Sequence, residues 1–215
     1  MKRIILSAAI AFAGLAVNAQ SERYTAAMEK LVPAIDTTRT VAGLTELANS
    51  FERIAEAEKT QWLPYYYAAL ANVNSANLLF TTGQTEQIDP ITDKAAPLLA
   101  KAEELQKENS EIFCLKKMLN TAKMMADPQN RYMTYGPAAA EALETAKKLN
   151  PENPRVYLLE GQDLFFTPEQ FGGDKQQAKK KFEEALKKYE SFKPADSISP
   201  TWGKAQAGYF LSQIK

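Results

Sequence analysis

The chain has 215 residues, which is enough for one domain with a sizeable hydrophobic core. Hydrophobic residues make up 45% and charged residues 24%, a composition that argues against a disordered chain. Basic and acidic residues both total 26, so the chain lacks the basic excess that would favour nucleic acid as a partner. Histidine is absent, which removes the commonest general base and the commonest zinc ligand.

The beginning of the chain predicts an export signal. Lys2 and Arg3 precede an apolar stretch, and small residues then allow cleavage before Gln20. The alternative is a buried N-terminal helix. Nothing later in the sequence is apolar for long enough to span a membrane, and no cysteine follows the cleavage site to carry a lipid anchor. We therefore expect a signal peptide at residues 1–19 and a periplasmic mature chain of residues 20–215, without a transmembrane segment.

The single cysteine, Cys114, cannot form an internal disulfide. It lies in an apolar run, which favours a thiol buried in the core, and a reactive thiol is the alternative. The sequence also lacks the nucleophile elbow, the zinc-protease motif, the P-loop and the dinucleotide fingerprint. Metal-ligating residues do not cluster either. We therefore expect no enzymatic activity, no metal and no cofactor.

Helical spacing dominates the chain after the signal, and the period-two alternation of strands is missing. Proline, glycine and asparagine divide the pattern into segments of roughly 14–20 residues, a normal helix length. The sequence therefore predicts an all-α chain. The expected helices lie near residues 22–35, 40–58, 62–82, 91–107, 110–126, 137–149, 154–167, 174–191 and 200–214.

Small and large apolar residues alternate at fixed offsets in every second predicted helix. Ala178, Phe182 and Ala185 show the pattern, and offsets of four and three place all three side chains on one helix face. In the preceding helix, Gly161 stands where a second helix can approach closely. The same spacing recurs at Ala139, Leu143 and Ala146, at Ala95, Leu99 and Ala102, and more loosely at Leu47, Phe51 and Ile54.

This combination resembles the tetratricopeptide repeat, which pairs a first helix carrying Leu-Gly and Tyr with a second helix carrying Ala-x3-Phe-x2-Ala. The resemblance covers helix pairs at about 22–58, 62–107, 110–149 and 154–191, and departs from the family in the insertions between helices. It implies a right-handed α-solenoid of about four hairpins, with a capping helix at 200–214. The layout is also similar to exported proteins of this type from Bacteroidetes-like Gram-negative bacteria.

Stacked helix pairs leave a concave inner surface that suits an extended peptide. In the helix predicted at 62–82, we expect Tyr66, Asn74 and Asn77 to contact a partner. Tyrosine offers an apolar body with a polar tip, and asparagine amides bond peptide backbone. The alternatives are a helix enclosed between its neighbours and asparagines that face a loop or solvent. This helix contains no lysine or arginine, so the carboxylate clamp of the family is not expected.

The predicted loop at residues 127–136 supplies two further candidate contacts, Tyr132 and Tyr135. An aromatic-rich loop must pack somewhere to offset its loss of entropy. It either folds over neighbouring helices, with Asp127 capping and Arg131 pairing internally, or forms one wall of a binding groove.

From these features we expect an exported scaffold or adaptor that binds a protein or peptide partner in the periplasm or at the outer membrane. The alternative is a small-molecule-binding accessory protein with a pocket between the repeats and their long loops. A deep apolar cavity under residues 127–136 would favour the alternative, and an open groove would favour the scaffold. Separately, Asp36-Thr37-Thr38 and Asp196-Ser197-Ile198 are similar to acceptor sites of periplasmic O-glycosylation.

Overall fold

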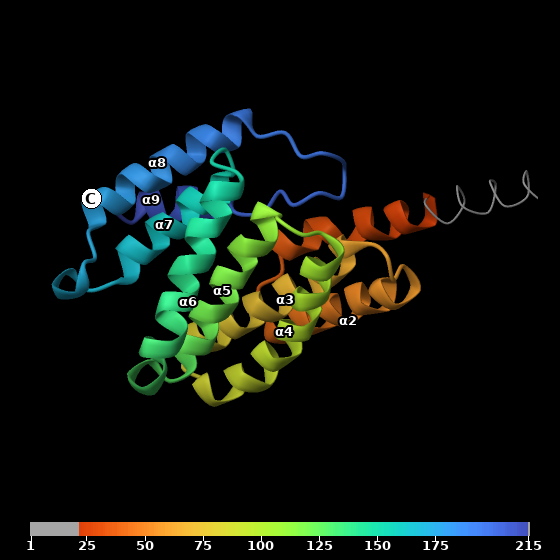
Figure 1. The fold of residues 1–215 in the computed structure, drawn as a ribbon, viewed down its shortest axis with the longest axis horizontal. Coiled ribbons are helices and arrows are strands. Elements are labelled where there is room, and N and C mark those ends of the chain that lie inside the picture. The colour runs from red at the N-terminus through yellow and green to blue at the C-terminus, as the bar shows by residue number, and fades with distance from the viewer. Residues whose placement is uncertain (1–21, 215) are drawn as a thin grey trace, which may run out of the picture.

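The computed structural model describes residues 22–214, and the predicted signal peptide at 1–19 lies outside this range. Within the described residues there is no β-strand, so the all-α prediction is confirmed (Figure 1). Residues 22–31 form the first helix. The elements that follow are η1 (Val32–Asp36), α2 (Val41–Ala57), α3 (Trp62–Thr81), η2 (Thr85–Gln87), α4 (Ile88–Leu105), α5 (Ser110–Ala126), α6 (Pro128–Leu149), α7 (Pro154–Phe166), η3 (Glu169–Phe171), α8 (Lys175–Ser191) and α9 (Lys204–Ser212).

Capping side chains fix the start of most of these helices. The side-chain oxygens of Thr40, Asn109, Asp127, Asn153 and Asp174 accept backbone N–H groups at the first turns of α2, α5, α6, α7 and α8. These N–H groups have no partner within the helix, so each cap satisfies donors that would otherwise need water. The observed helix boundaries confirm most of the predicted ones to within a few residues.

The prediction of a loop at residues 127–136 was wrong, because α6 already begins at Pro128. Proline is well suited to the first helical position, where its missing N–H would be unpaired in any case. Pro137 lies inside α6, and close packing of α6 along α5 outweighs its helix-breaking tendency. The predicted internal pairing of Arg131 is confirmed, since its guanidinium donates to both carboxylate oxygens of Asp89.

The predicted capping helix at 200–214 is also shorter than expected, because α9 begins only at Lys204. Gly203 has a φ of 106°, a left-handed conformation that turns the chain immediately before α9. Pro200 and Trp202, which were assigned to the helix, are instead buried in the connection that precedes it.

The helices pack in sequence as hairpins, with α3 against α4, α5 against α6 and α7 against α8 (Figure 1). The first members of these pairs also contact each other in turn, α3 with α5 and α5 with α7. This is the arrangement expected of stacked hairpins, and it supports the solenoid prediction. The assignment of these hairpins to the tetratricopeptide repeat stays a prediction.

The small-against-large spacing has the structural role that the sequence predicted. Ala178, Phe182 and Ala185 are all fully buried. A Cβ atom at Gly161 would lie 2.6 Å from the ring of Phe182, so α7 and α8 are closer than any larger residue at this position would allow. None of the helices among residues 22–214 combines the length and the apolar character that a bilayer crossing requires.

Candidate binding site

Residues 192–203, the connection between α8 and α9, pack against the first turns of α3 and α7, and we call this segment the strap. Figure 1 shows the strap running out from the end of α8 toward the N-terminal helix and returning to α9. The hydroxyl of Tyr67 donates to the carbonyl of Ile198 at 2.9 Å, and Nε1 of Trp202 donates to the hydroxyl of Tyr66 at 2.8 Å. The strap therefore fills the part of the predicted binding surface that surrounds Tyr66.

A buried ion pair lies beneath the strap. Arg155 is fully buried, and its guanidinium donates to Oε1 of Glu111 at 2.9 Å and to the carbonyl of Pro200. The guanidinium carbon is 4.9 Å from the ring centre of Phe192 and 5.2 Å from that of Trp202. Burial raises the pKa of the Glu111 carboxyl, although the charge of Arg155 acts in the opposite direction. Since the rings of Phe192 and Trp202 cover the cation, these two strap residues pack against the core.

The prediction that Tyr66 contacts a partner was wrong. Its side chain is fully buried and its ring packs edge-on against Trp62 and Tyr67. The alternative, a helix enclosed between its neighbours, describes this part of α3. Asn74 is half-buried and Asn77 is exposed on the same helix, so a role for these two residues in binding stays a prediction.

The two predicted tyrosines of residues 127–136 lie on α6. Tyr132 is 62% exposed, and its ring packs over Gly136, whereas Tyr135 is half-buried. Helix α5 packs against both α3 and α6 and lies between them (Figure 1). The candidate residues on α3 and α6 therefore do not form one site.

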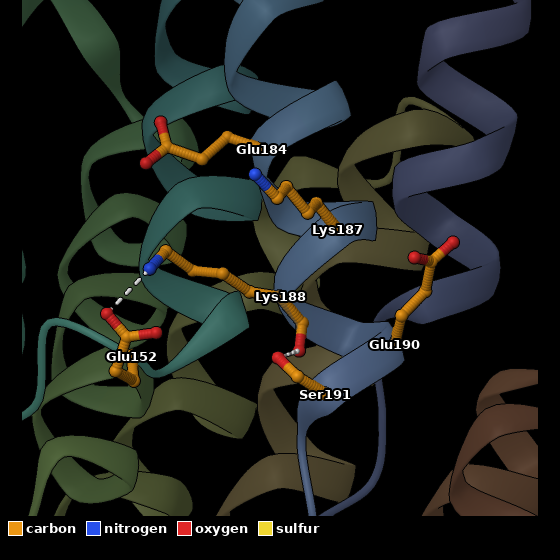
Figure 2. A pocket seen from close by; sticks show the side chains of 6 residues that line it. All are labelled: Glu152, Glu184, Lys187, Lys188, Glu190 and Ser191. Atoms are coloured by element: carbon orange, nitrogen blue, oxygen red, sulfur yellow. Dashed lines mark hydrogen bonds and ion pairs between the residues drawn. The ribbon is translucent and has the colours of Figure 1, made fainter.

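Two of the surface hollows among residues 22–214 have room for a small molecule, but neither is both apolar and large. Figure 2 shows the larger one, of about 510 Å³, where Lys188 forms an ion pair with Glu152 at 2.9 Å. All its lining residues are charged or polar: Glu152, Glu184, Lys187, Lys188, Glu190 and Ser191. The second hollow, between α4 and α5, has a volume of about 250 Å³, which is below the usual range for ligand pockets, roughly 300–1,000 Å³.

A cluster of aromatic rings is exposed where α7 ends and α9 passes the start of α8, near the end marked C in Figure 1. We call Phe165, Phe166, Phe182, Tyr209 and Phe210 the aromatic patch. Phe210 is at its centre, stacked on the fully buried Phe182 with ring centres 5.5 Å apart, and in edge contact with Phe166 and Tyr209 at 5.4 Å. Phe166 is 64% exposed and Tyr209 is 61% exposed, so the outer rings are supported from below and open to solvent.

Local sequence spacing does not bring these rings together, since they come from three helices. A signal was present nevertheless. Phe165-Phe166 and Tyr209-Phe210 are consecutive aromatic pairs in helices, and neighbouring helix residues point about 100° apart. One ring of each pair must therefore point away from the core.

The solved structure of the HusA haemophore from Porphyromonas gingivalis is similar to this chain, with a TM-score of 0.78 and 35% sequence identity. The similarity covers 89% of this chain and 92% of the haemophore chain. This chain belongs to the family of the HusA haemophore. No protein-family model matches the chain, and no curated protein matches it.

In this member of the HusA family, a lysine lies beside the aromatic patch and the one cysteine is buried. Cys114 is fully buried, as predicted, and burial raises the pKa of its thiol. Across residues 22–214 no group of histidine, cysteine, aspartate or glutamate side chains is arranged to hold a metal ion. At the aromatic patch, Nζ of Lys175 lies 5.8 Å from the ring centre of Phe165, and Lys179 follows one turn later on α8.

Proposed function

We propose that this protein is an exported carrier that binds haem or a related tetrapyrrole, and that it is not an enzyme. The observation that carries the proposal is the 35% identity to the HusA haemophore over 92% of the haemophore chain. It favours the small-molecule alternative over the protein scaffold. The strap supports the same choice, because it fills the surface around Tyr66 where a peptide was expected to bind.

The expected location is the periplasm. It rests on the signal peptide predicted at residues 1–19, and a haemophore relative fits an exported role.

The amino-acid composition indicates which kinds of side chain could hold such a ligand. The sequence has no histidine, and its one cysteine is buried, so the two side chains that most often bind haem iron are unavailable. Burial of the flat macrocycle against apolar side chains is then the main source of affinity. We therefore expect iron-free protoporphyrin to bind about as tightly as haem.

The test is a titration of the mature chain, residues 20–215, with haem and separately with protoporphyrin. The change in the Soret absorbance and the quenching of Trp62 and Trp202 fluorescence both report binding. Saturable, equimolar binding of both compounds is the expected result. A linear, unsaturable response equal to that of the urea-unfolded chain would show that the protein is not a tetrapyrrole carrier.

A further inference from the structure

We propose that the aromatic patch is the tetrapyrrole site, with the macrocycle lying against Phe166 and Tyr209 and its carboxylates directed toward Lys175 and Lys179. This inference rests on the proposed function and adds to it the place and the orientation of the ligand.

The support for the patch begins with the exposure of its rings. Water-exposed aromatic rings that touch one another are unusual on a soluble protein and mark binding surfaces. Phe166 and Tyr209 both contact Phe210, whose ring rests on the buried Phe182, so the outer rings need little reorganisation to receive a ligand. A preorganised surface loses less side-chain entropy on binding.

The chemistry of the patch matches both parts of a haem-type molecule. The macrocycle is a flat aromatic disc, which gains free energy by stacking on ring faces and ring edges. Its propionates are carboxylates that must stay hydrated or meet a cation. Lys175 and Lys179 lie one turn apart at the start of α8, and the ammonium group of Lys175 is beside Phe165.

The two hollows fit the ligand less well. The hollow in Figure 2 is lined by glutamates, lysines and a serine, and an apolar disc seated there would strip water from charged groups without replacing their bonds. The hollow between α4 and α5 has about 250 Å³, too little for a macrocycle. The patch combines exposed aromatic rings with a lysine at its edge.

The test compares Phe166→Ala and Tyr209→Ala with Tyr132→Ala in porphyrin titrations of the mature chain. Tyr132 is a matched control, because it is the same residue type as Tyr209 with nearly the same exposed fraction, 62% against 61%, and it lies on α6. Each patch variant should weaken binding about tenfold or more, as removal of a central aromatic contact does. The control should stay within about twofold of the parent chain.

Each outcome distinguishes the two proposals. If the parent chain shows no saturable binding, the proposed function fails. If the parent chain binds but the patch variants bind equally well, or Tyr132→Ala is the variant that loses affinity, the function stands and the location is wrong. If the patch instead joins two copies of the chain, sedimentation would show a dimer, and Phe166→Ala would dissociate that dimer. This result would also overturn the inference.

The lysines have a separate readout. Replacement of both Lys175 and Lys179 by glutamine should weaken porphyrin binding about threefold to tenfold at low salt, and the difference should shrink at high salt because ions screen exposed charges. Lys59→Gln, an exposed lysine in the turn after α2, is the control. A loss that does not depend on salt would contradict the orientation proposed for the carboxylates.

Discussion

Arg155 is the residue whose environment departs most from that of an ordinary surface arginine. It is fully buried between the carboxylate of Glu111 and the aromatic rings of the strap. Removing one member of a buried pair leaves the other as an uncompensated charge, which costs far more than the pair itself contributes.

We therefore predict that Arg155→Ala lowers the free energy of unfolding by about 3–5 kcal/mol in urea titrations followed by circular dichroism. Arg155→Met combined with Glu111→Gln removes both charges and should recover most of that loss. Arg53→Ala, at an exposed arginine of α2, should change stability by less than about 0.5 kcal/mol. An Arg155→Ala variant as stable as the Arg53 control would show that the ion pair has no role in holding the strap.

For single residues, the sequence predicted chemical roles more accurately than it predicted the direction in which a side chain points. The burial of Cys114, the cap at Asp127 and the close approach at Gly161 were all predicted and are confirmed. Tyr66 was placed on the wrong side of its helix. A run of three tyrosines does not show which ring faces the core when the covering segment lies 136 residues away along the chain.

Helices α6 and α7 share few contacts, and the carboxylate of Glu160 connects them. Oε1 of Glu160 on α7 accepts from Lys147 on α6 at 2.6 Å, and its Oε2 is 2.7 Å from Nζ of Lys181 on α8. Burial alone would raise the pKa of Glu160, but the two lysines outweigh it and hold the pKa below its usual value of 4.5. One side chain therefore ties three helices together.

Because the pKa of Glu160 is lowered in the folded chain, its contribution to the free energy of unfolding depends on pH. The unfolded chain takes up the proton first, so the contribution of Glu160 is present above pH 4.5 and is lost as the pH falls through the folded-state pKa. Glu160→Gln should reduce the free energy of unfolding at neutral pH by on the order of 1 kcal/mol, and the difference from the parent chain should vanish in acid. Glu144→Gln, at an exposed ion pair with Lys148 within α6, should show a much smaller pH dependence, because solvent screens this pair even though Lys148 also lowers the pKa of Glu144. Equal acid sensitivity of the two variants would contradict the bridge.

Helix positions were predictable because caps and apolar spacing are local features of the sequence. The error at residues 127–136 has a physical cause as well. Two prolines bracket the segment, and either can start a helix or end one. Pro128 starts α6, while Pro137 is accommodated because α6 packs along α5. Packing of this kind is not visible from local spacing.

For the whole molecule, the solenoid prediction anticipated stacked hairpins but not the segment that packs against the starts of α3 and α7. The strap has no helical period, and its sequence gives no sign that it returns across α3. It changes the functional conclusion, since it fills the surface around Tyr66 and directs attention to the end of the molecule where α7 and α9 expose the aromatic patch. This patch is distant in sequence from the residues first expected to bind.

Trp202 offers the sharpest test of the strap as a structural element. It is 3% exposed, its Nε1 donates to Tyr66, and its carbonyl accepts from the hydroxyl of Tyr189 at 2.9 Å. Trp202→Ala should lower the free energy of unfolding by about 3–5 kcal/mol, because it empties a large space in the core.

Trp202→Phe keeps a ring over Arg155 but loses the hydrogen bond to Tyr66, so a smaller loss of about 1–2 kcal/mol is expected. Urea unfolding gives both values, and limited proteolysis shows whether the strap opens by itself. In the alanine variant we expect cleavage within residues 192–203 at denaturant concentrations where the helices remain folded. A strap that is cut equally fast in the parent chain would lie loosely on the surface. In that case the inner face could open to a partner, and the scaffold function would again be supported.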